Sequence, residues 1–218
     1  MNDIYDFLRG PALDRAAALT ILEIGCATGV DSLDLRRLFP KARIYCFEPD
    51  PRNIYAMKKT PLKDVVTIVE AAVGDRDGKA TFNLSEGKVP QGADIHTWTF
   101  SSSLKKPTGH LQEAPWVKFK QSVEVRTVRL DTFCREQGLD RIDFIWADTQ
   151  GAEDLVIAGG QEALARTRYF YTECYDKPLY EGQINLDQIR DRLPGGAGAW
   201  EIIHRFPTDV LLRNTKLA

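Results

Sequence analysis

The stretch Leu22-Glu-Ile-Gly-Cys-Ala-Thr-Gly29 decides the fold of this chain. It overlaps a short apolar run, so residues 20–25 are predicted to form a buried strand. Gly25 and Gly29 allow the backbone to turn sharply after that strand and to approach a ligand closely. The pattern ExGxxxG differs from the GxGxxG of dinucleotide sites, because one glycine is missing and an acid precedes the first. A carboxylate at Glu23 favours a ligand that carries positive charge.

The elements that follow alternate between strands and helices. Short β-rich runs predict strands at 20–25, 42–47, 65–69, 142–147 and 168–173. Helices are predicted at 31–39, 52–59, 130–137, 152–165 and 185–193. Strands separated by helices build a parallel sheet, and two last strands at 200–206 and 209–213 are predicted to pair antiparallel through a tight turn. We therefore expect an α/β fold with a mostly parallel seven-stranded sheet that ends in an antiparallel hairpin.

An insertion at about 78–128 interrupts this alternation. Its two flanks are predicted strands of a β-hairpin, and a long loop joins them. Loops of this length inside a compact fold usually carry a function or are mobile. The loop holds Trp98, Phe100 and Trp116, which favours a cover over the active site, with a plain surface excursion as the alternative. We expect residues 1–218 to form one domain that contains this insertion.

The composition is that of an ordinary globular protein, with 218 residues of which 43% are hydrophobic and 28% charged. A net charge of −2 supplies no bulk attraction to nucleic acid or to an anionic membrane. No apolar run is long enough to span a membrane, and the first residues lack the pattern of a secretory signal. The four cysteines have no metal-binding spacing, so we expect reduced thiols and a cytoplasmic protein. The oligomeric state stays open.

An acid and a run of small residues mark the next two strand ends. Glu48 and Pro49 follow the second predicted strand. In Rossmann-like folds an acid at this place accepts hydrogen bonds from ribose hydroxyls. The alternative for Glu48 is an exposed acid that complements the start of the next helix. After the third strand, Ala72 and its small neighbours leave room for a flat ring such as adenine.

Six blocks of the sequence together resemble the FkbM family of methyltransferases. They are Leu22-Glu-Ile-Gly-Cys-Ala-Thr-Gly29, Phe47-Glu-Pro-Asp50, Ala71-Ala-Val-Gly-Asp75, Ser101-Ser-Ser-Leu104, Val128-Arg-Leu-Asp131 and Asp148-Thr-Gln-Gly-Ala-Glu153. The resemblance covers roughly residues 20 to 175, and its last block is the most specific. It implies a class I methyltransferase fold with S-adenosylmethionine as the methyl donor. Two positions depart from the family pattern: Trp146-Ala147 replaces a basic residue, and Gln150 stands where Glu is frequent.

The cofactor implied by the resemblance carries a sulfonium and an ammonium, which agrees with the acid that precedes Gly25. The strand ends and the resemblance together predict its contacts. The predicted cofactor-binding residues are Glu23, Gly25, Cys26, Ala27, Thr28, Gly29, Asp31, Glu48, Pro49, Ala72 and Asp148.

Methyl transfer to a hydroxyl needs an aligned acceptor oxygen and is helped by a base. Asp148 ends the fourth predicted strand at the cofactor edge of the sheet, so it is the first candidate for that base. Glu173 ends the fifth strand at the same edge and is the second catalytic candidate. His96, His110 and His204 are the alternatives.

The acceptor implied by the resemblance is a hydroxyl on a sugar, a glycolipid or a glycosylated natural product. Its predicted contacts are Ser102, Ser103, Gln150, Glu153 and Tyr175. Trp98, Trp116 and Tyr175 are candidates for an apolar platform under a sugar ring.

We therefore expect an S-adenosylmethionine-dependent O-methyltransferase whose partner is a small-molecule or glycan acceptor and not a nucleic acid. Asp148, Glu153 and Glu173 together offer oxygen ligands for Mg²⁺, but a metal site is not favoured. An NAD-dependent oxidoreductase is the first alternative, although the third glycine of its motif is missing. A non-catalytic Rossmann-like binding module is the second, because fold does not fix function.

Overall fold

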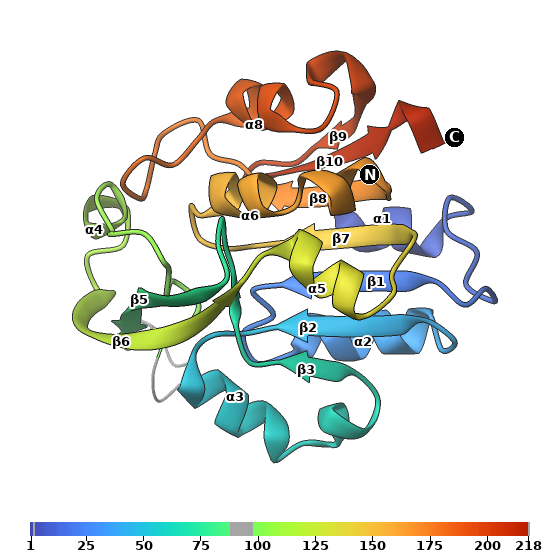
Figure 1. Ribbon diagram of the computed structural model, residues 1–218. Coiled ribbons are helices and arrows are strands. Elements are labelled where there is room, and N and C mark those ends of the chain that lie inside the picture. Colours follow the sequence, from blue (N-terminus) through green and yellow to red (C-terminus); the bar gives the residue numbers. More distant parts are fainter. Residues whose placement is uncertain (2, 88–97, 218) are drawn as a thin grey trace.

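The computed structural model describes residues 1, 3–87 and 98–217, and Figure 1 shows their arrangement. In this part of the chain, seven strands form one sheet in the order β3-β2-β1-β7-β8-β10-β9. The strands are β1 (Thr20–Ile24), β2 (Arg43–Phe47), β3 (Thr67–Val69), β7 (Ile142–Ala147), β8 (Thr167–Glu173), β9 (Trp200–Arg205) and β10 (Asp209–Asn214). Strand β10 runs antiparallel to β8 and β9, and the other neighbouring pairs are parallel. The predicted α/β fold with its terminal antiparallel hairpin is confirmed.

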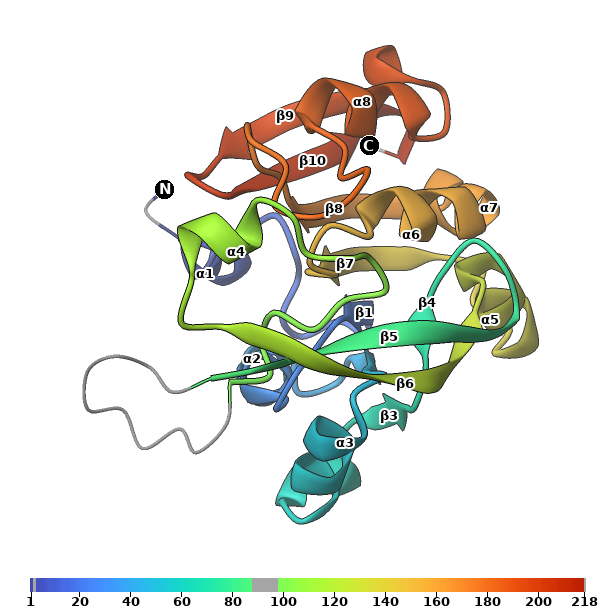
Figure 2. The same cartoon turned by 90° about the vertical axis from the view of Figure 1, so that its left-hand side faces the viewer.

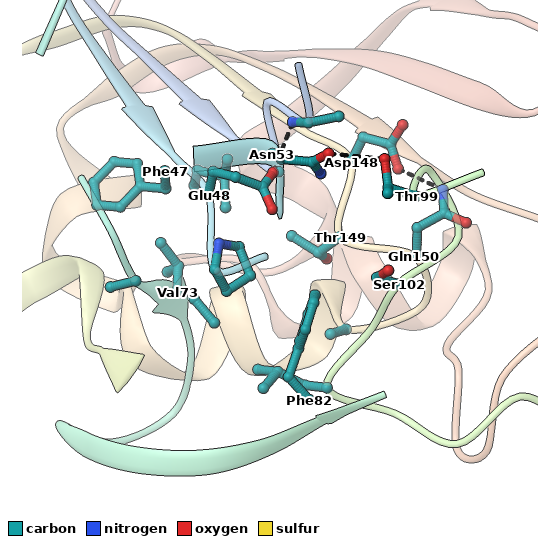
Figure 3. A pocket seen from close by; sticks show the side chains of 18 of the residues that line it. Phe47, Glu48, Asn53, Val73, Phe82, Thr99, Ser102, Asp148, Thr149 and Gln150 are labelled. Atoms are coloured by element: carbon teal, nitrogen blue, oxygen red, sulfur yellow. Dashed lines mark hydrogen bonds between the residues drawn. The ribbon is translucent and has the colours of Figure 1, made fainter. Parts of the chain in front are cut away.

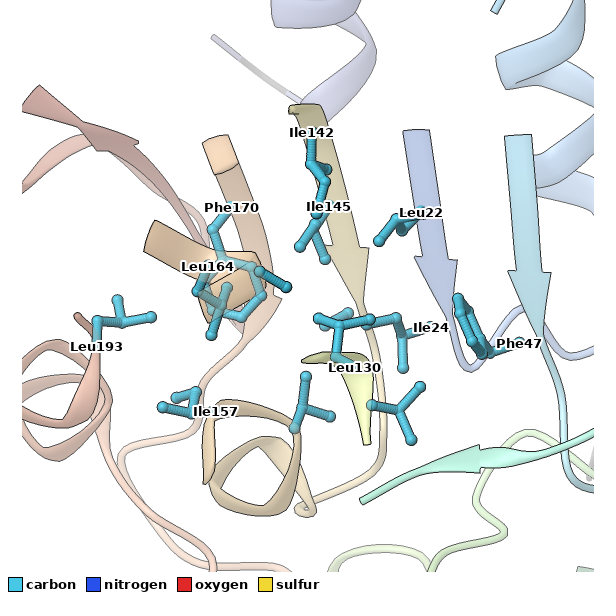
Figure 4. Close-up of a cluster of buried hydrophobic side chains, with 14 of the residues drawn as sticks. Leu22, Ile24, Phe47, Leu130, Ile142, Ile145, Ile157, Leu164, Phe170 and Leu193 are labelled. Atoms are coloured by element: carbon cyan, nitrogen blue, oxygen red, sulfur yellow. The ribbon is translucent and has the colours of Figure 1, made fainter. Parts of the chain in front are cut away.

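Helices cover both faces of this sheet. One face carries α1 (Ile4–Arg9), α2 (Val30–Leu38) and α3 (Pro51–Lys58), and the other carries α5 (Leu130–Glu136), α6 (Glu153–Gly159), α7 (Gln161–Ala165) and α8 (Leu186–Arg192). Side chains of β1 alternate between the faces: Leu22 and Ile24 pack in the cluster of Figure 4, and Ile21 packs on the opposite side. All of β1 is buried, as a central parallel strand requires. Among the described helices, none has the length and apolar character to cross a membrane.

Two elements differ from the sequence prediction for local reasons. Strand β3 begins at Thr67 and not at residue 65, because Pro61–Asp64 forms a 3-10 helix whose C-cap is Val65. Helix α1 has no counterpart in the prediction, because its six residues are too few to show a clear helical period.

Side-chain caps fix where two of the predicted helices begin. The carboxylate of Asp50 accepts a hydrogen bond from the backbone N–H of Arg52 at 2.9 Å, and Pro51 occupies the first position of α3. Asn185 caps α8, as predicted, and forms a capping box with Gln188. The cap of α3 matters for the site, because it holds the chain that follows β2 in place.

The insertion forms a second, smaller sheet. Strands β5 (Gly78–Glu86) and β6 (Lys118–Val128) pair antiparallel, which confirms the predicted hairpin. Strand β4 (Ala72–Val73) pairs parallel with β6 and was not predicted, because two residues carry no strand pattern. In Figures 1 and 2 this sheet and the short helix α4 (His110–Glu113) lie at the side to which the parallel strands point. Ligands of open α/β sheets bind at that edge.

A glycine lets α6 pack closely on the chain beside β4. A Cβ atom at Gly159 would lie 1.9 Å from the backbone oxygen of Gly74. The contact ties the helix that follows β7 to the segment that leads into the second sheet. The Gly159-Gly160 interruption between α6 and α7 agrees with the sequence prediction.

We expect Gly159→Ala to lower the free energy of unfolding by about 1–3 kcal/mol, because the added methyl group must displace backbone and not a flexible side chain. Urea denaturation followed by circular dichroism measures the change. Gly198→Ala is the matched control, since a Cβ atom there meets nothing within 4 Å, and it should change stability by less than about 0.5 kcal/mol. Equal effects of the two substitutions would contradict the close contact.

Candidate active site

A pocket lies at the carboxyl ends of β1, β2 and β7, next to the second sheet (Figure 3). About 630 Å³ of space lies within it, part of which is open to solvent. Gly25 forms one wall with a φ of +86°, and a Cβ atom there would lie 1.9 Å from the backbone oxygen of Asp148. The turn after β1 therefore requires glycine, both for its left-handed conformation and for this contact.

Glu48 lies in the pocket wall and is 3% exposed. Its two carboxyl oxygens accept hydrogen bonds from the backbone N–H groups of Ala27 and Asp50, each at 2.7 Å. Burial raises the pKa of Glu48 to about 8, with a contribution from the Asp50 carboxylate, although the backbone hydrogen bonds act in the opposite direction. A buried carboxyl of this kind is unlike the exposed helix-start acid that was the alternative for Glu48.

Several predicted cofactor residues line this pocket. They are Gly25, Ala27, Glu48, Pro49, Ala72 and Asp148. Glu23 instead lies buried under the turn, where the Ser32 hydroxyl donates to its carboxylate at 2.5 Å. Burial raises the pKa of Glu23 well above its ordinary value. Its contacts support a role in holding the turn.

The remaining predicted cofactor residues also surround the turn. Cys26 is buried, and its Sγ lies 3.7 Å from Sδ of Met57. A hydrogen bond with the Cys46 thiol and burial raise the pKa of Cys26, so its thiol stays protonated. Gly29 caps α2, and Asp31 in the first turn accepts a hydrogen bond from the Tyr5 hydroxyl at 2.5 Å. Thr28 is half-buried within the turn.

The pocket also contains residues that the sequence did not single out. Asn53 of α3 accepts a hydrogen bond from the Thr99 hydroxyl at 2.8 Å, which joins the insertion to the β2 side. Phe82 and Leu104 of the insertion and Val73 of β4 supply apolar lining. These residues meet only through tertiary contacts. The sequence signals near some of them were the aromatic content of the insertion and the blocks at 71–75 and 101–104.

A second pocket adjoins the first and holds about 1250 Å³, including open space. Its lining consists of Trp98, Phe100, Ser101, His110, Glu113, Ala114, Asp148, Gln150, Tyr175, Asp176, Lys177 and Leu179. Phe100, Asp148 and Gln150 belong to both pockets. The ring of Trp98 lies 5.0 Å from those of both Phe100 and Trp116, so these aromatic residues form one cluster at the wall.

Two acids and an amide lie where the pockets meet. Nε2 of Gln150 donates to Oδ1 of Asp148 at 2.7 Å and lies 3.2 and 3.3 Å from the oxygens of Glu173. The Tyr175 hydroxyl donates to Glu173 at 2.9 Å. Burial raises the pKa of Asp148 to about 6, and burial and the Asp148 carboxylate raise that of Glu173 well above its usual range. A base that ionises near pH 6 is suited to proton transfer at neutral pH.

The predicted acceptor residues fall into two groups. Gln150 and Tyr175 line the second pocket, and Ser102 lines the first. Glu153 is 1% exposed and accepts hydrogen bonds from the backbone and hydroxyl of Thr149, at 3.1 and 2.8 Å. Burial raises the pKa of Glu153 to about 7. Ser103 is fully buried and donates to the backbone oxygen of Gln150 at 2.8 Å, so Ser103 and Glu153 support the loop after β7 from behind.

The three histidines differ in their relation to the site. His110 lines the second pocket, its Nε2 lies 2.9 Å from the Ser101 hydroxyl, and burial lowers its pKa. His204 lies on the edge strand β9, where its ring packs on Phe206. His96 lies outside the described residues. Within the ranges that the structure describes, no three His, Cys, Asp or Glu side chains are grouped to hold a metal ion.

These buried acids predict how stability depends on pH. Glu48 and Glu153 keep protons in the folded protein that the unfolded chain releases, because their pKa values are raised to about 8 and about 7. The folded state therefore loses stability as pH rises through this window. We expect the Tm of the ligand-free protein to fall between pH 6.5 and 8, a range above the titration of His110. Differential scanning fluorimetry at a series of pH values measures the Tm. The variant Glu153→Gln should lose less Tm over this range than the wild type. A Tm that rises steadily from pH 6.5 to 8 would contradict the raised pKa values of these two acids.

Comparisons with known proteins agree with this geometry. The methyltransferase FkbM domain matches residues 23–199. The 2-O-methyltransferase NoeI of Sinorhizobium fredii (strain NBRC 101917 / NGR234) is 46% identical over 203 residues, which cover 90% of this chain and 80% of NoeI.

Solved structures show a similar fold. Fibrillarin of Aeropyrum pernix, crystallised with natively bound S-adenosylmethionine, aligns with a TM-score of 0.50 at 12% identity over 93% of this chain and 69% of its own. The bifunctional kinase-methyltransferase WbdD aligns with a TM-score of 0.50 at 13% identity over 96% of this chain and 38% of its own. Neither the NAD-dependent oxidoreductase nor the non-catalytic module gains support from these comparisons. The chain therefore belongs to the FkbM family of S-adenosylmethionine-dependent methyltransferases.

Proposed function

We propose that this methyltransferase transfers the methyl group to a hydroxyl of a sugar, a glycolipid or a glycosylated natural product. The position of Asp148, which lines both pockets, carries the proposal. A donor in the first pocket and an acceptor in the second would meet beside this carboxylate. The relative NoeI is named as a 2-O-methyltransferase, which supports an oxygen acceptor.

The first pocket fits the cofactor in its chemistry. The Glu48 carboxyl lies in the wall with two oxygens that can serve ribose hydroxyls. Ala72, Val73 and Phe82 provide apolar surface for adenine. When bound, S-adenosylmethionine supplies a methyl group on a positively charged sulfonium. We propose direct contacts for Gly25, Ala27, Glu48, Pro49, Ala72 and Asp148, and a role in holding the turn for Glu23, Cys26, Thr28, Gly29 and Asp31.

Asp148 is the proposed general base. A sugar hydroxyl is a weak nucleophile, and the Asp148 carboxylate would take its proton as the oxygen becomes methylated. The raised pKa of Asp148, about 6, leaves it mostly ionised at neutral pH while it remains a useful proton acceptor. Glu173, which shares the Gln150 amide with Asp148, would bind and orient the acceptor.

The second pocket suits a saccharide. Trp98 and Phe100 present aromatic surface on which the apolar face of a sugar ring can pack. Tyr175 and Lys177 on the opposite loop add groups that can bond hydroxyls. The proposed acceptor set is Gln150 and Tyr175 by contact, with Ser102 acting from the wall of the first pocket and Ser103 and Glu153 acting through the loop that they support.

We also propose that residues 1–218 form one methyltransferase domain, because helices on both faces share one sheet and the insertion completes the pocket at its edge. The net charge of −2 favours a small-molecule or glycan acceptor over a nucleic acid. The four free cysteines are buried, which supports a reducing compartment such as the cytoplasm.

Above pH 8, where the Glu48 carboxyl is ionised, Glu48→Ala should weaken S-adenosylmethionine binding by about 1.5–3 kcal/mol, the scale of hydrogen bonds to a charged group. Isothermal titration calorimetry measures the change. Glu70→Ala is the matched control, because Glu70 is a half-exposed acid that pairs with Lys58. Unchanged affinity in the Glu48 variant would remove this residue from the cofactor site.

The function is tested by incubating the protein with isotopically labelled S-adenosylmethionine and a panel of glycans and cell-extract glycolipids, with mass spectrometry as the readout. We expect label on a sugar hydroxyl, with kcat/KM rising as pH passes through about 6. Asp148→Asn should lower turnover by about 10²- to 10⁴-fold and leave cofactor affinity within a few-fold. Label on a nitrogen or carbon atom would refute the proposed acceptor. Lost cofactor binding in the folded variant would instead make Asp148 mainly a cofactor ligand and not the base.

A further inference from the structure

Gln150 has an unusual backbone and a fully engaged side chain. Its φ is +54°, a left-handed conformation that non-glycine residues rarely adopt, and Gly151 follows with a φ of +89°. The amide nitrogen faces Asp148 and Glu173, with N–O distances of 2.7 to 3.3 Å. The amide oxygen Oε1 faces away from the acids, towards the hydroxyl of Tyr180.

Tyr180 lies behind the pocket walls and is 1% exposed. Its single hydroxyl proton is shared between Oε1 of Gln150, at 3.0 Å from the hydroxyl oxygen, and the backbone oxygen of Ser101, at 2.8 Å. The ring packs so closely on Gly151 that a Cβ atom there would lie 2.7 Å from Cβ of Tyr180. Gly151 thus leaves space for Tyr180. The hydroxyl of Tyr180 contacts the amide oxygen of Gln150, which cannot donate a hydrogen bond to the two acids.

We propose that Tyr180 is a positioning residue, which holds the Gln150 amide with its NH₂ group towards Asp148 and Glu173 so that one donor serves both carboxyl groups. An amide has a donor end and an acceptor end. The hydroxyl of Tyr180 stabilises Oε1 on the protein side. Without it, Oε1 loses this partner, and the side chain is held from the carboxyl side alone.

The surroundings make this donor important, because the side chains around the two carboxyl groups are mostly acids. Glu153, Asp209 and Asp31 raise the pKa of one or both members of the pair, and Asp209 itself accepts a hydrogen bond from Tyr171. The other titratable groups at this junction are Tyr175, His110, Glu113, Asp176 and Lys177 of the second pocket. The Gln150 amide lowers the pKa of Asp148 against these acids. Loss of its alignment should therefore make Asp148 harder to ionise.

The same hydroxyl links the acids to the acceptor wall. Ser101, whose backbone oxygen it also contacts, accepts a hydrogen bond from Trp98 Nε1 at 2.9 Å and contacts His110 through its hydroxyl. Tyr180 therefore fixes the insertion and the Gln150 amide relative to each other. This inference rests on the proposed function only in taking Asp148 as the group that meets the acceptor.

The test compares Tyr180→Phe, Gln150→Ala and the double variant with the wild type. For Tyr180→Phe we expect kcat/KM near pH 7 to fall about 3- to 10-fold, the scale of one hydrogen bond. The acid limb of the pH profile should move to higher pH, and activity should approach the wild-type value at high pH. The double variant should be no worse than Gln150→Ala, because residues that act through one another are not additive. Tyr45→Phe, a buried tyrosine that packs on Phe133, is the matched control.

Two measurements separate this inference from the proposed function. Calorimetry with S-adenosylhomocysteine should give a Kd for Tyr180→Phe within about 3-fold of the wild type. Carboxyl ¹³C NMR titration, assigned with Asp148→Asn and Glu173→Gln, should show the pair titrating at higher pH in Tyr180→Phe, whether or not an acceptor is known. A loss of activity that is equal at every pH, additivity with Gln150→Ala, or an unchanged titration would overturn the positioning role. Failure of the wild type to methylate any saccharide would instead refute the proposed acceptor.

Discussion

The absence of a side chain at residue 25 is the constraint on which the site depends. Gly25 packs its Cα against the backbone oxygen of Asp148, and a Cβ atom would come within 1.9 Å of that oxygen. The ends of β1 and β7 can therefore approach closely, so that the turn beside Glu48 and the loop that carries Asp148 share one pocket.

Much of the fold follows from short-range patterns. The glycine turn at 25–29, the apolar strand runs and the capped helix starts predict an alternating α/β chain, because period and capping are local properties. Strand β4 and helix α1 escaped prediction since each is too short to show a period. The second sheet was predicted without β4, because this strand joins it through a parallel pairing with β6 that no local signal encodes.

The site was most predictable at its strand ends. Glu48 and Asp148 follow strands whose ends must meet at one edge, so topology alone placed them in the pocket. The sequence could not separate them from Glu23 and Glu153, which do not line the pocket. That difference is set by packing between distant segments. Asn53 was missed for the same reason, since its partner Thr99 comes from the insertion.

The second sheet and its loop contribute to both pockets. Phe82 and Thr99 line one, Trp98 lines the other, and Phe100 lines both. The two pockets, proposed above for donor and acceptor, thus share a wall to which one continuous stretch of the gene contributes. Exchange of that stretch between relatives would transfer substrate preference and cofactor affinity as a single inherited block. Changes on the opposite loop at 175–177 would diversify the acceptor side alone, so the two walls of this enzyme are free to evolve at different rates.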